Sequence, residues 1–477
     1  MNDHEKKAPP SKETAVNNME FVMGWYGRPV AKMKFSGADF GFDYESGWLL
    51  PLESYKTRQA GKEPMFLRSF LPFWAGIGSN RSNDKKANAL MSKLFSQQEL
   101  FLSNLAIVRS ASQLSALGYD HLHGRLRDFT SDDGVFIGTQ KSIDVMTREM
   151  ETNMAQVAKE KRLTQISGAQ TKISMHLSPQ GELIWERDQP STHIIKYAGF
   201  GGDAGRVRGA AEWAGMTLAR AGGVVCADFA LIEMPSEGGH SLNYLTERFD
   251  LPVSKEDERL IFCEEVGAAM GYRPDPASSL TLNEVIDALM EFSTNKRGDM
   301  AELFKQVAAN CILENADFHA RNMSLLKVAA PTLDSFRSVR LSPAYDVMRT
   351  RDFSPVPIPD GESEEMQLCF TDPQSNVIEF DKPTLAHFQM VGNVMGLSGE
   401  QSEKMLYNVA AGMLDKAIFL KHHQPGLFDN HELARQHVIE TSEVVIKNTL
   451  SLFPGLHDKV EMQGCDSEPA RRPGPRP

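Results

Sequence analysis

The sequence lacks three features that would have placed it in a special class of protein. It contains no run of about 18 apolar residues, so we expect no membrane span and no membrane contact. Its polar N-terminus, MNDHEKKAPPSKETAVNN, has no apolar core of the kind that a secretory signal needs. Its five cysteines are far apart and form no CxxC pair, which argues against a disulfide framework or a zinc knuckle. We therefore expect a protein of the reducing cytoplasm.

Clustered positive charge is also scarce. The net charge of −12 argues against a protein that coats nucleic acid, because binding phosphates requires clustered Lys and Arg. A DNA-binding repressor is disfavoured further because the sequence has no recognisable recognition helix. Hydrophobic residues (41%) and charged residues (24%) are at levels ordinary for soluble globular proteins. At 477 residues the chain exceeds one compact core, so we expect two domains or two lobes.

The strand and helix signals divide the chain near Asp250. Short strands with glycine turns are predicted within 20–60, and an apolar period predicts helix over 84–118. A second group of strands follows within 171–249, interrupted by the helix GRVRGAAEWAGMTLARAGG. After Asp250 helical patterns dominate, beginning with KEDERLIFCEEVGAAMGY. The pattern predicts an α+β protein with a β-rich first half and an α-rich second half.

The stretch ENADFHARNMSLL carries the strongest chemical signal. Asp317 and Asn322 have the D-x-x-x-x-N spacing of a kinase catalytic loop, where Asp orients the acceptor hydroxyl and Asn holds Mg²⁺. Phosphoryl transfer builds negative charge on non-bridging oxygens, and a divalent cation held by hard oxygen ligands neutralises that charge. Further on, Asp346 in LSPAYDVMRT follows a predicted strand and lies where a second metal ligand is needed. Tyr345 and the missing glycine distinguish this motif from the DFG of kinases.

The first half supplies the parts that would hold a nucleotide. Lys196 ends the strand THIIKY and the following helix carries Glu212, which suits a Lys–Glu pair that grips phosphates. The small-residue turn SGAQTK leads into a strand and can aim backbone N–H groups at phosphate oxygens, although it is neither GxGxxG nor a Walker loop. Asp317 or Asn322 alone would more often cap a turn. The order of all these pieces along the chain, however, matches a bilobal kinase.

Five motifs resemble, in sequence and in order, those of the HipA family of bacterial toxin–antitoxin serine/threonine kinases: SGAQTKIS, THIIKY, TERFD, NADFHARNMSLL and LSPAYDV. The resemblance covers residues 160–350 and extends more faintly to FGFDYESGWL and the C-terminal helices. It implies a bilobal protein-kinase-like fold of the HipA type, with a β-rich N-terminal lobe, a small barrel-like subdomain and an all-α C-terminal lobe. The expected domains are a disordered tail (1–18), a HipA-like N-terminal subdomain (19–150), an N-lobe core with the nucleotide loop (151–250), a helical C-lobe with the catalytic loop and metal Asp (251–458) and a disordered tail (459–477).

Carried over position by position, the resemblance implies a role for each motif residue. Asp317 would be the catalytic base, and Asn322 and Asp346 would be the Mg²⁺ ligands. Lys196 would contact the ATP phosphates. The other implied ATP-binding residues are Ser167, Gly168, Ala169, Gln170, Thr171 and Lys172 over the nucleotide, Glu247, Arg248 and Phe249 at the hinge that holds adenine, and His319, Arg321 and Tyr345 beside the metal ligands; we expect His319 mainly to brace its loop.

Three positions depart from the family pattern. Arg321 stands where the family usually has lysine. This keeps the positive charge but replaces a compact ammonium group with a planar guanidinium group. Leu71-Pro72 is followed by FWAGIGSNR, whereas the family usually has Leu-Pro-Glu-Gly. The serine that some members autophosphorylate falls at Gln165, so self-phosphorylation at the adjacent Ser167 is a hypothesis. A phosphopeptide map showing Ser167 unmodified after incubation with ATP and Mg²⁺ would count against it.

The resemblance implies an ATP- and Mg²⁺-dependent serine/threonine kinase that acts as a toxin. The implied protein substrate is a translation component such as an aminoacyl-tRNA synthetase, and the implied partner is a small helix-turn-helix antitoxin that binds operator DNA. Two alternatives stay open: a HipA-like kinase without a toxin role, acting on another protein or a small molecule, and a catalytically idle regulatory scaffold. Turnover that depends on Mg²⁺ would distinguish either kinase from the scaffold.

Overall fold

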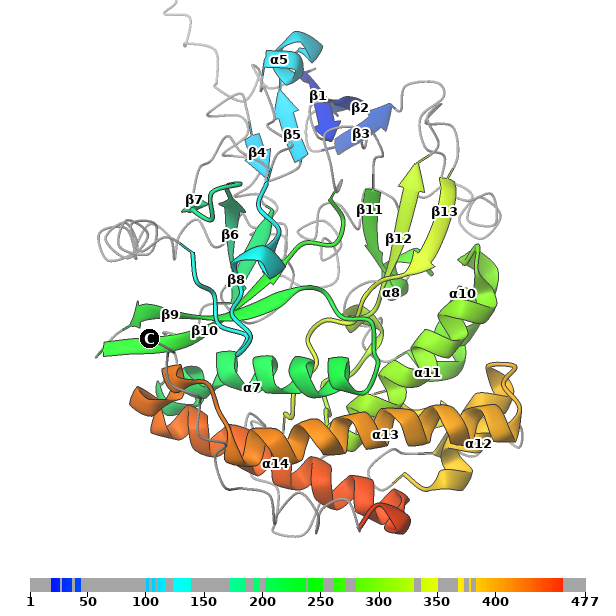
Figure 1. Ribbon diagram of the computed structural model, residues 1–477. Helices are drawn as coiled ribbons and strands as arrows, with labels where there is room; N and C mark the ends of the chain where they lie inside the picture. The colour runs from blue at the N-terminus through cyan, green and yellow to red at the C-terminus, as the bar shows by residue number, and fades with distance from the viewer. Residues whose placement is uncertain are drawn as a thin grey trace, which may run out of the picture.

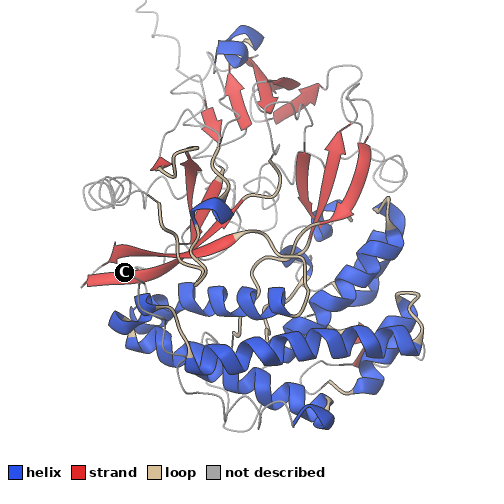
Figure 2. Ribbon diagram, viewed as in Figure 1, coloured by secondary structure: helices blue, strands red, loops and turns tan. Residues whose placement is uncertain are grey.

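A computed structural model shows a small N-terminal sheet, two central sheets and a layer of helices (Figure 1 and Figure 2). Both predicted tails lie outside the residues that it describes, and the predicted domain boundaries stay predictions. The described residues are 19–25, 28–36, 39–43, 100–102, 105–108, 110–116, 123–138, 172–184, 192–196, 202–236, 239–251, 261–270, 280–329, 336–350, 368–372, 377–378 and 383–457.

The N-terminal sheet is antiparallel, with strand order β3-β2-β1-β5-β4. The strands predicted within 20–60 are confirmed as far as Asp43, and residues 44–60 lie outside the described residues. The helix predicted over 84–118 is wrong over 100–102 and 105–108, where two strands form, and is confirmed over 111–116. Apolar runs this short do not distinguish strand from helix, and here pairing with β1 decides the outcome. A barrel-like closure of the sheet stays a prediction. The elements are β1 (Met19–Trp25), β2 (Arg28–Ser36), β3 (Asp39–Asp43), β4 (Leu100–Leu102), β5 (Leu105–Val108) and α5 (Ala111–Ala116).

The second sheet, which we call the front sheet, is antiparallel in the order β7-β6-β8-β10-β9. Its register places Lys172, Lys196 and Tyr244 directly opposite one another on three neighbouring strands, so all three side chains leave the same face. Helix α7 packs on that face, and the segment 123–138 covers the other face. The elements are β6 (Lys172–Leu177), β7 (Leu183–Ile184), β8 (His193–Lys196), β9 (Phe229–Ser236), β10 (Gly239–Glu247), α7 (Gly202–Ala221) and the 3₁₀ turn η2 (Leu126–Phe129).

The C-terminal half contains strands, so the predicted all-α C-terminal lobe is wrong. The segment KEDERLIFCEEVGAAMGY, predicted as helix, forms β11 (Ile261–Glu265) and the short helix α8 (Val266–Ala269). Alternating burial along β11 and its pairing with β12 override the helical pattern. The sheet order is β11-β12-β13, and a separate pair joins β14 to β15. The other strands are β12 (Ser324–Ala329), β13 (Phe336–Leu341), β14 (Phe370–Thr371) and β15 (Val377–Ile378).

The other elements described in the C-terminal half are helices, and α13 and α14 lie along the side of α7 that faces away from the front sheet (Figure 1). One large apolar core joins α7 to this layer and to the front sheet, so α7 is buried between them. Among the described residues, no helix is long and apolar enough to cross a bilayer. The elements are α10 (Leu282–Phe292), α11 (Lys296–Leu313), α12 (Leu385–Val394), α13 (Gly399–His422), α14 (Glu432–Leu452) and the 3₁₀ turns η4 (Ala320–Asn322), η6 (Gly426–Asn430) and η7 (Pro454–Leu456).

Candidate functional site

The centre of the candidate site is Lys196, at the end of β8. Its Nζ contacts carboxylates from two distant segments, Glu212 on α7 and Asp346 on the loop after β13. The Lys196 and Glu212 side chains are only 8% and 2% exposed, so water screens their interaction little. Burial lowers the pKa of Lys196 to about 8, and the Glu212 carboxylate limits the shift. The predicted Lys–Glu pair is therefore formed, and Asp346 joins it.

A second lysine lies beside Lys196. Lys172 is opposite it on the neighbouring strand β6, so both side chains leave the same face of the front sheet. Burial lowers the pKa of Lys172, while the carboxylates of Glu212, Glu265 and Asp317 oppose the shift. Lys172 is thus within electrostatic reach of both the Glu212 and the Asp317 carboxylates. The other residues predicted for the nucleotide turn, Ser167, Gly168, Ala169, Gln170 and Thr171, lie outside the described residues.

The loop that follows α11 presents Asp317 to solvent. Glu314 ends the helix in a left-handed conformation (φ 55°) and turns the chain into the loop. The Asp317 side chain is 56% exposed, and His319 Nε2 lies 3.5 Å from its Oδ1. His319 Nδ1 accepts the Arg321 backbone N–H at 3.2 Å, and Asn322 Nδ2 donates to the Asp317 carbonyl at 2.8 Å. His319 thus braces the loop, and the Asn322 side chain uses its amide nitrogen, not its amide oxygen, in the bond to Asp317.

Hydrogen bonds join this loop to the segment that carries Asp346. Asn315 Nδ2 donates to Asn310 Oδ1 at 2.7 Å and to the Asp346 carbonyl at 3.3 Å. The Ala316 N–H donates to Thr350 Oγ1 at 2.8 Å. The structure therefore ties together the two loops that carry the three predicted oxygen-bearing side chains.

The predicted hinge residues have different environments. The Phe249 ring lies 5.8 Å from the Tyr345 ring, at a tilt of 31°. The Tyr345 hydroxyl lies 2.7 Å from Ser324 Oγ and donates to the Arg321 carbonyl at 3.1 Å. Arg248 forms a two-pronged ion pair with Asp250, from Nε at 2.9 Å and from a terminal nitrogen at 2.7 Å. Phe249 therefore connects the end of β10 to the Asp346 loop through Tyr345.

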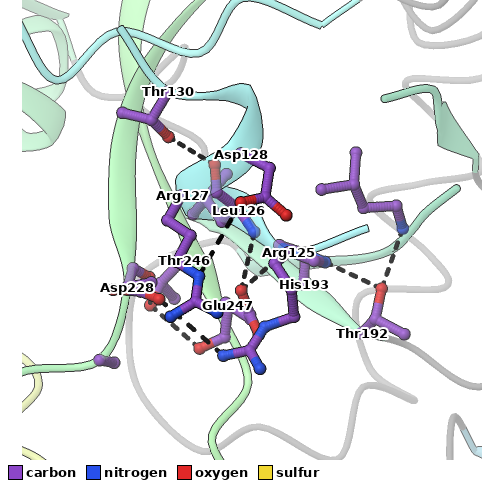
Figure 3. Close-up of polar contacts among 12 residues, drawn as sticks. Arg125, Leu126, Arg127, Asp128, Thr130, Thr192, His193, Asp228, Thr246 and Glu247 are labelled. Carbon is purple, nitrogen blue, oxygen red and sulfur yellow. Dashed lines mark hydrogen bonds and ion pairs between the residues drawn. The ribbon is translucent and has the colours of Figure 1, made fainter. Parts of the chain in front are cut away.

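Glu247, also predicted at the hinge, directs its side chain to the opposite face of the front sheet (Figure 3). Its carboxylate accepts the Leu126 backbone N–H at 2.8 Å and lies 2.5 Å from Arg125 Nε. Burial raises the pKa of Glu247, and the contacts from Leu126 and Arg125 oppose that shift. Any contribution of Glu247 to adenine binding is therefore through its backbone.

One carboxylate of the site, Glu265 at the end of β11, was not predicted from the sequence. Its Oε2 lies 3.6 Å from Arg321 Nε. Burial raises the pKa of Glu265, opposed by the charges of Arg321, His319 and Lys172. The sequence did not indicate a role for Glu265 because β11 was predicted as helix. In the strand, Glu265 lies opposite Ser324, which is two residues after Asn322. The signal in the sequence that could have identified Glu265 was the acidic pair Glu264-Glu265 within an otherwise apolar stretch.

The chemistry of the donors fits Mg²⁺ bound together with a nucleotide. Asp346 supplies carboxylate oxygens and Asn322 an amide oxygen, both hard donors of the kind that Mg²⁺ prefers. Within the described ranges, no group of three or more His, Cys, Asp and Glu side chains could hold a metal by itself. Lys172 and Lys196 are cationic side chains suited to the phosphates of such a nucleotide.

Acid is expected to destabilise the front sheet through His193 on β8. The ring is fully buried and its Nδ1 lies 2.8 Å from Thr192 Oγ1. Burial lowers the pKa of His193 well below 6.5, and His123, His176 and Arg125 add to the shift. Because its folded pKa is below its unfolded pKa, its stabilising contribution is complete above about pH 6.5. It is lost as the pH falls toward the folded pKa, by up to about 1.4 kcal/mol per pH unit.

Urea unfolding at about pH 7.5 and about pH 5.5 measures this effect. The loss of unfolding free energy on acidification should be smaller in His193→Gln than in the wild type. The exposed His422 provides the matched control, His422→Gln, which should behave as the wild type. Equal acid losses in all three proteins would contradict the assignment.

The chain is similar in sequence to known proteins. The profile of the HipA-like C-terminal domain matches residues 164–417. Two proteins of Sinorhizobium fredii, whose names describe them provisionally as kinases, are similar. Y4dM is 24% identical over 213 residues, which are 43% of this chain and 46% of Y4dM, so the chain spans less than half of that relative. Y4mE is 25% identical over 346 residues, 68% of this chain and 76% of Y4mE.

The fold resembles that of a solved structure. This is the HipA chain of the Shewanella oneidensis MR-1 toxin–antitoxin system, in complex with HipB and operator DNA. The TM-score is 0.58 at 14% identity, and the superposition covers 93% of this chain and 99% of that chain. At this identity the likeness concerns the fold alone, which is a mixed α/β arrangement.

Proposed function

The chain belongs to the HipA-like C-terminal domain family, and from this premise we propose that it is an ATP- and Mg²⁺-dependent serine/threonine protein kinase. The observation that carries the proposal is the double contact of Lys196 with Glu212 and Asp346, which joins the front sheet, α7 and the loop after β13. The Asp317 loop is bonded to the same Asp346 segment. These are the parts that phosphoryl transfer needs.

Each part has a chemical role in this proposal. Lys172 and Lys196 bind and orient the ATP phosphates. Asn322 and Asp346 would hold Mg²⁺, which when bound neutralises charge on the phosphate oxygens. Asp317 accepts a hydrogen bond from the acceptor hydroxyl and takes its proton.

The residues around Asp317 set its orientation. His319 Nε2 lies 3.5 Å from the carboxylate, while its other ring nitrogen is fixed by the Arg321 N–H. Asn322 Nδ2 donates to the Asp317 backbone carbonyl. These contacts keep the base in one place, and preorganisation of this kind lowers the barrier to reaction.

We also propose a partner and a substrate. The solved HipA structure contains HipB and operator DNA, which supports a small helix-turn-helix antitoxin that would link this chain to DNA. The proposed substrate is a translation component such as an aminoacyl-tRNA synthetase. A kinase of another protein or of a small molecule uses the same site, and an idle scaffold would bind ATP without turnover.

Labelled ATP distinguishes these alternatives. We expect the purified chain with Mg²⁺ to transfer the γ-phosphate to serine or threonine of a discrete protein in a cell lysate, and chelation of Mg²⁺ should abolish transfer. Label appearing only in small molecules would identify a small-molecule kinase. Nucleotide binding with no label transferred to any acceptor would support the scaffold and reject the kinase.

A further inference from the structure

Helix α7 touches the Asp346 loop through a glycine. A Cβ atom built on Gly215 would lie 2.3 Å from the Val347 carbonyl oxygen and 2.7 Å from the Met348 Cα. Both atoms are backbone, so no side-chain rotation relieves the contact. Gly215 is three residues after Glu212 and therefore on a neighbouring part of the same helix surface. The missing side chain lets the loop lie directly against α7.

The loop that lies against α7 contains a residue with an unusual backbone conformation. Asp346 has φ 56°, the left-handed region that non-glycine residues adopt rarely. Neighbouring contacts hold the segment on both sides: the Ala344 N–H donates to the Val225 carbonyl at 2.7 Å, and Asn315 Nδ2 donates to the Asp346 carbonyl. Residues held in this way at a site commonly serve its function.

Helix α7 cannot easily move away from the loop. On its sheet side, a Cβ on Gly209 would lie 2.3 Å from the Leu242 carbonyl of β10. On its other side, a Cβ on Gly412 of α13 would lie 2.2 Å from the Ala221 carbonyl at the end of α7. The helix is therefore in close backbone contact with both layers. A methyl group at position 215 would displace the loop rather than the helix.

We infer that Gly215 is a positioning residue that sets the place of the Asp346 carboxylate relative to Lys196 and Glu212. The inference rests on the proposed function, because it assigns the position of a proposed Mg²⁺ ligand. It predicts that one added methyl group at position 215 impairs use of the metal while the lysines still bind the nucleotide.

Three variants test this inference in the full-length chain. Gly215→Ala introduces the clash at the loop. Gly412→Ala introduces an equally close clash with α7 at its far end, away from Asp346. Gly399→Ala is the control without a clash, because no described atom lies within 4 Å of its added Cβ. For each we would measure Tm, affinity for a fluorescent ATP analogue without metal, and transfer rate against Mg²⁺ concentration.

Gly215→Ala is expected to keep metal-free nucleotide affinity within about twofold of the wild type, while transfer falls about a hundredfold, the scale for a misplacement of roughly 1 Å. The Mg²⁺ concentration at half-maximal rate should rise at least about tenfold, as expected when a metal ligand is misplaced. Gly412→Ala should lower Tm without changing the Mg²⁺ dependence.

Two results would overturn the inference: wild-type Mg²⁺ dependence in Gly215→Ala, or failure of Gly215→Ala to fold while Gly412→Ala folds. The second would make the glycine a requirement of the fold alone. A wild-type chain without Mg²⁺-dependent transfer would instead reject the proposed function.

Discussion

Replacing Asp317 by asparagine should lower phosphoryl transfer at least about a hundredfold, the scale for a positioned general base. Asparagine keeps the size of the side chain but cannot take the proton of the acceptor hydroxyl. The side chain is 56% exposed, and the loop is held through the Asp317 backbone carbonyl, which the substitution leaves in place. We therefore expect little change in Tm or in affinity for ATP.

The assay is the initial rate of γ-phosphate transfer at saturating ATP. Asp429 in η6 is exposed, so Asp429→Asn is the matched control and should retain the wild-type rate. A wild-type rate in Asp317→Asn would show that another group takes the proton, and the assigned role would be wrong.

Replacing Lys196 by methionine should damage both stability and nucleotide binding. The substitution leaves the Glu212 carboxylate buried without its cation and removes the partner of Asp346. Removing one partner of a buried pair typically costs about 3–5 kcal/mol. We expect the lower end of that range, because Asp346 is 27% exposed and water partly replaces the lost partner. Affinity for ATP should fall because the phosphates lose a direct cationic contact.

Urea unfolding and nucleotide titration measure the two effects separately. The exposed Lys404 of α13 provides the control Lys404→Met, which should leave both unchanged. Adding Glu212→Gln to Lys196→Met should recover part of the stability, because the unpaired buried charge is removed, but none of the nucleotide affinity. Wild-type affinity in Lys196→Met would contradict a phosphate-binding role.

The parts of the site with local signals could be predicted from the sequence. The strand ending in Lys196 and the helix carrying Glu212 have clear periodicities, and the structure shows these two residues in contact. The spacing of Asp317 and Asn322 also reflects a local arrangement, in which one side chain holds the backbone of the other. Such features depend on residues near one another in the chain.

The parts that depend on tertiary contacts could not be predicted. β11 has a helical pattern and becomes a strand only because β12 lies beside it, which concealed Glu265. The face to which Glu247 points follows from the register of β8 and β10. In the sequence Gly215 is an ordinary glycine within a helix. Its close contact with the Val347 carbonyl is seen only in the tertiary structure. Each case requires knowledge of a segment far away in the sequence.

The most direct test of the central claim is a crystal structure of the chain with Mg²⁺ and a non-hydrolysable ATP analogue. The account predicts Mg²⁺ bound by oxygens of Asn322 and Asp346 and of the phosphates, with Lys196 on the phosphates and Asp317 facing the γ-phosphate. A nucleotide bound elsewhere, or a metal that contacts neither Asn322 nor Asp346, would contradict it.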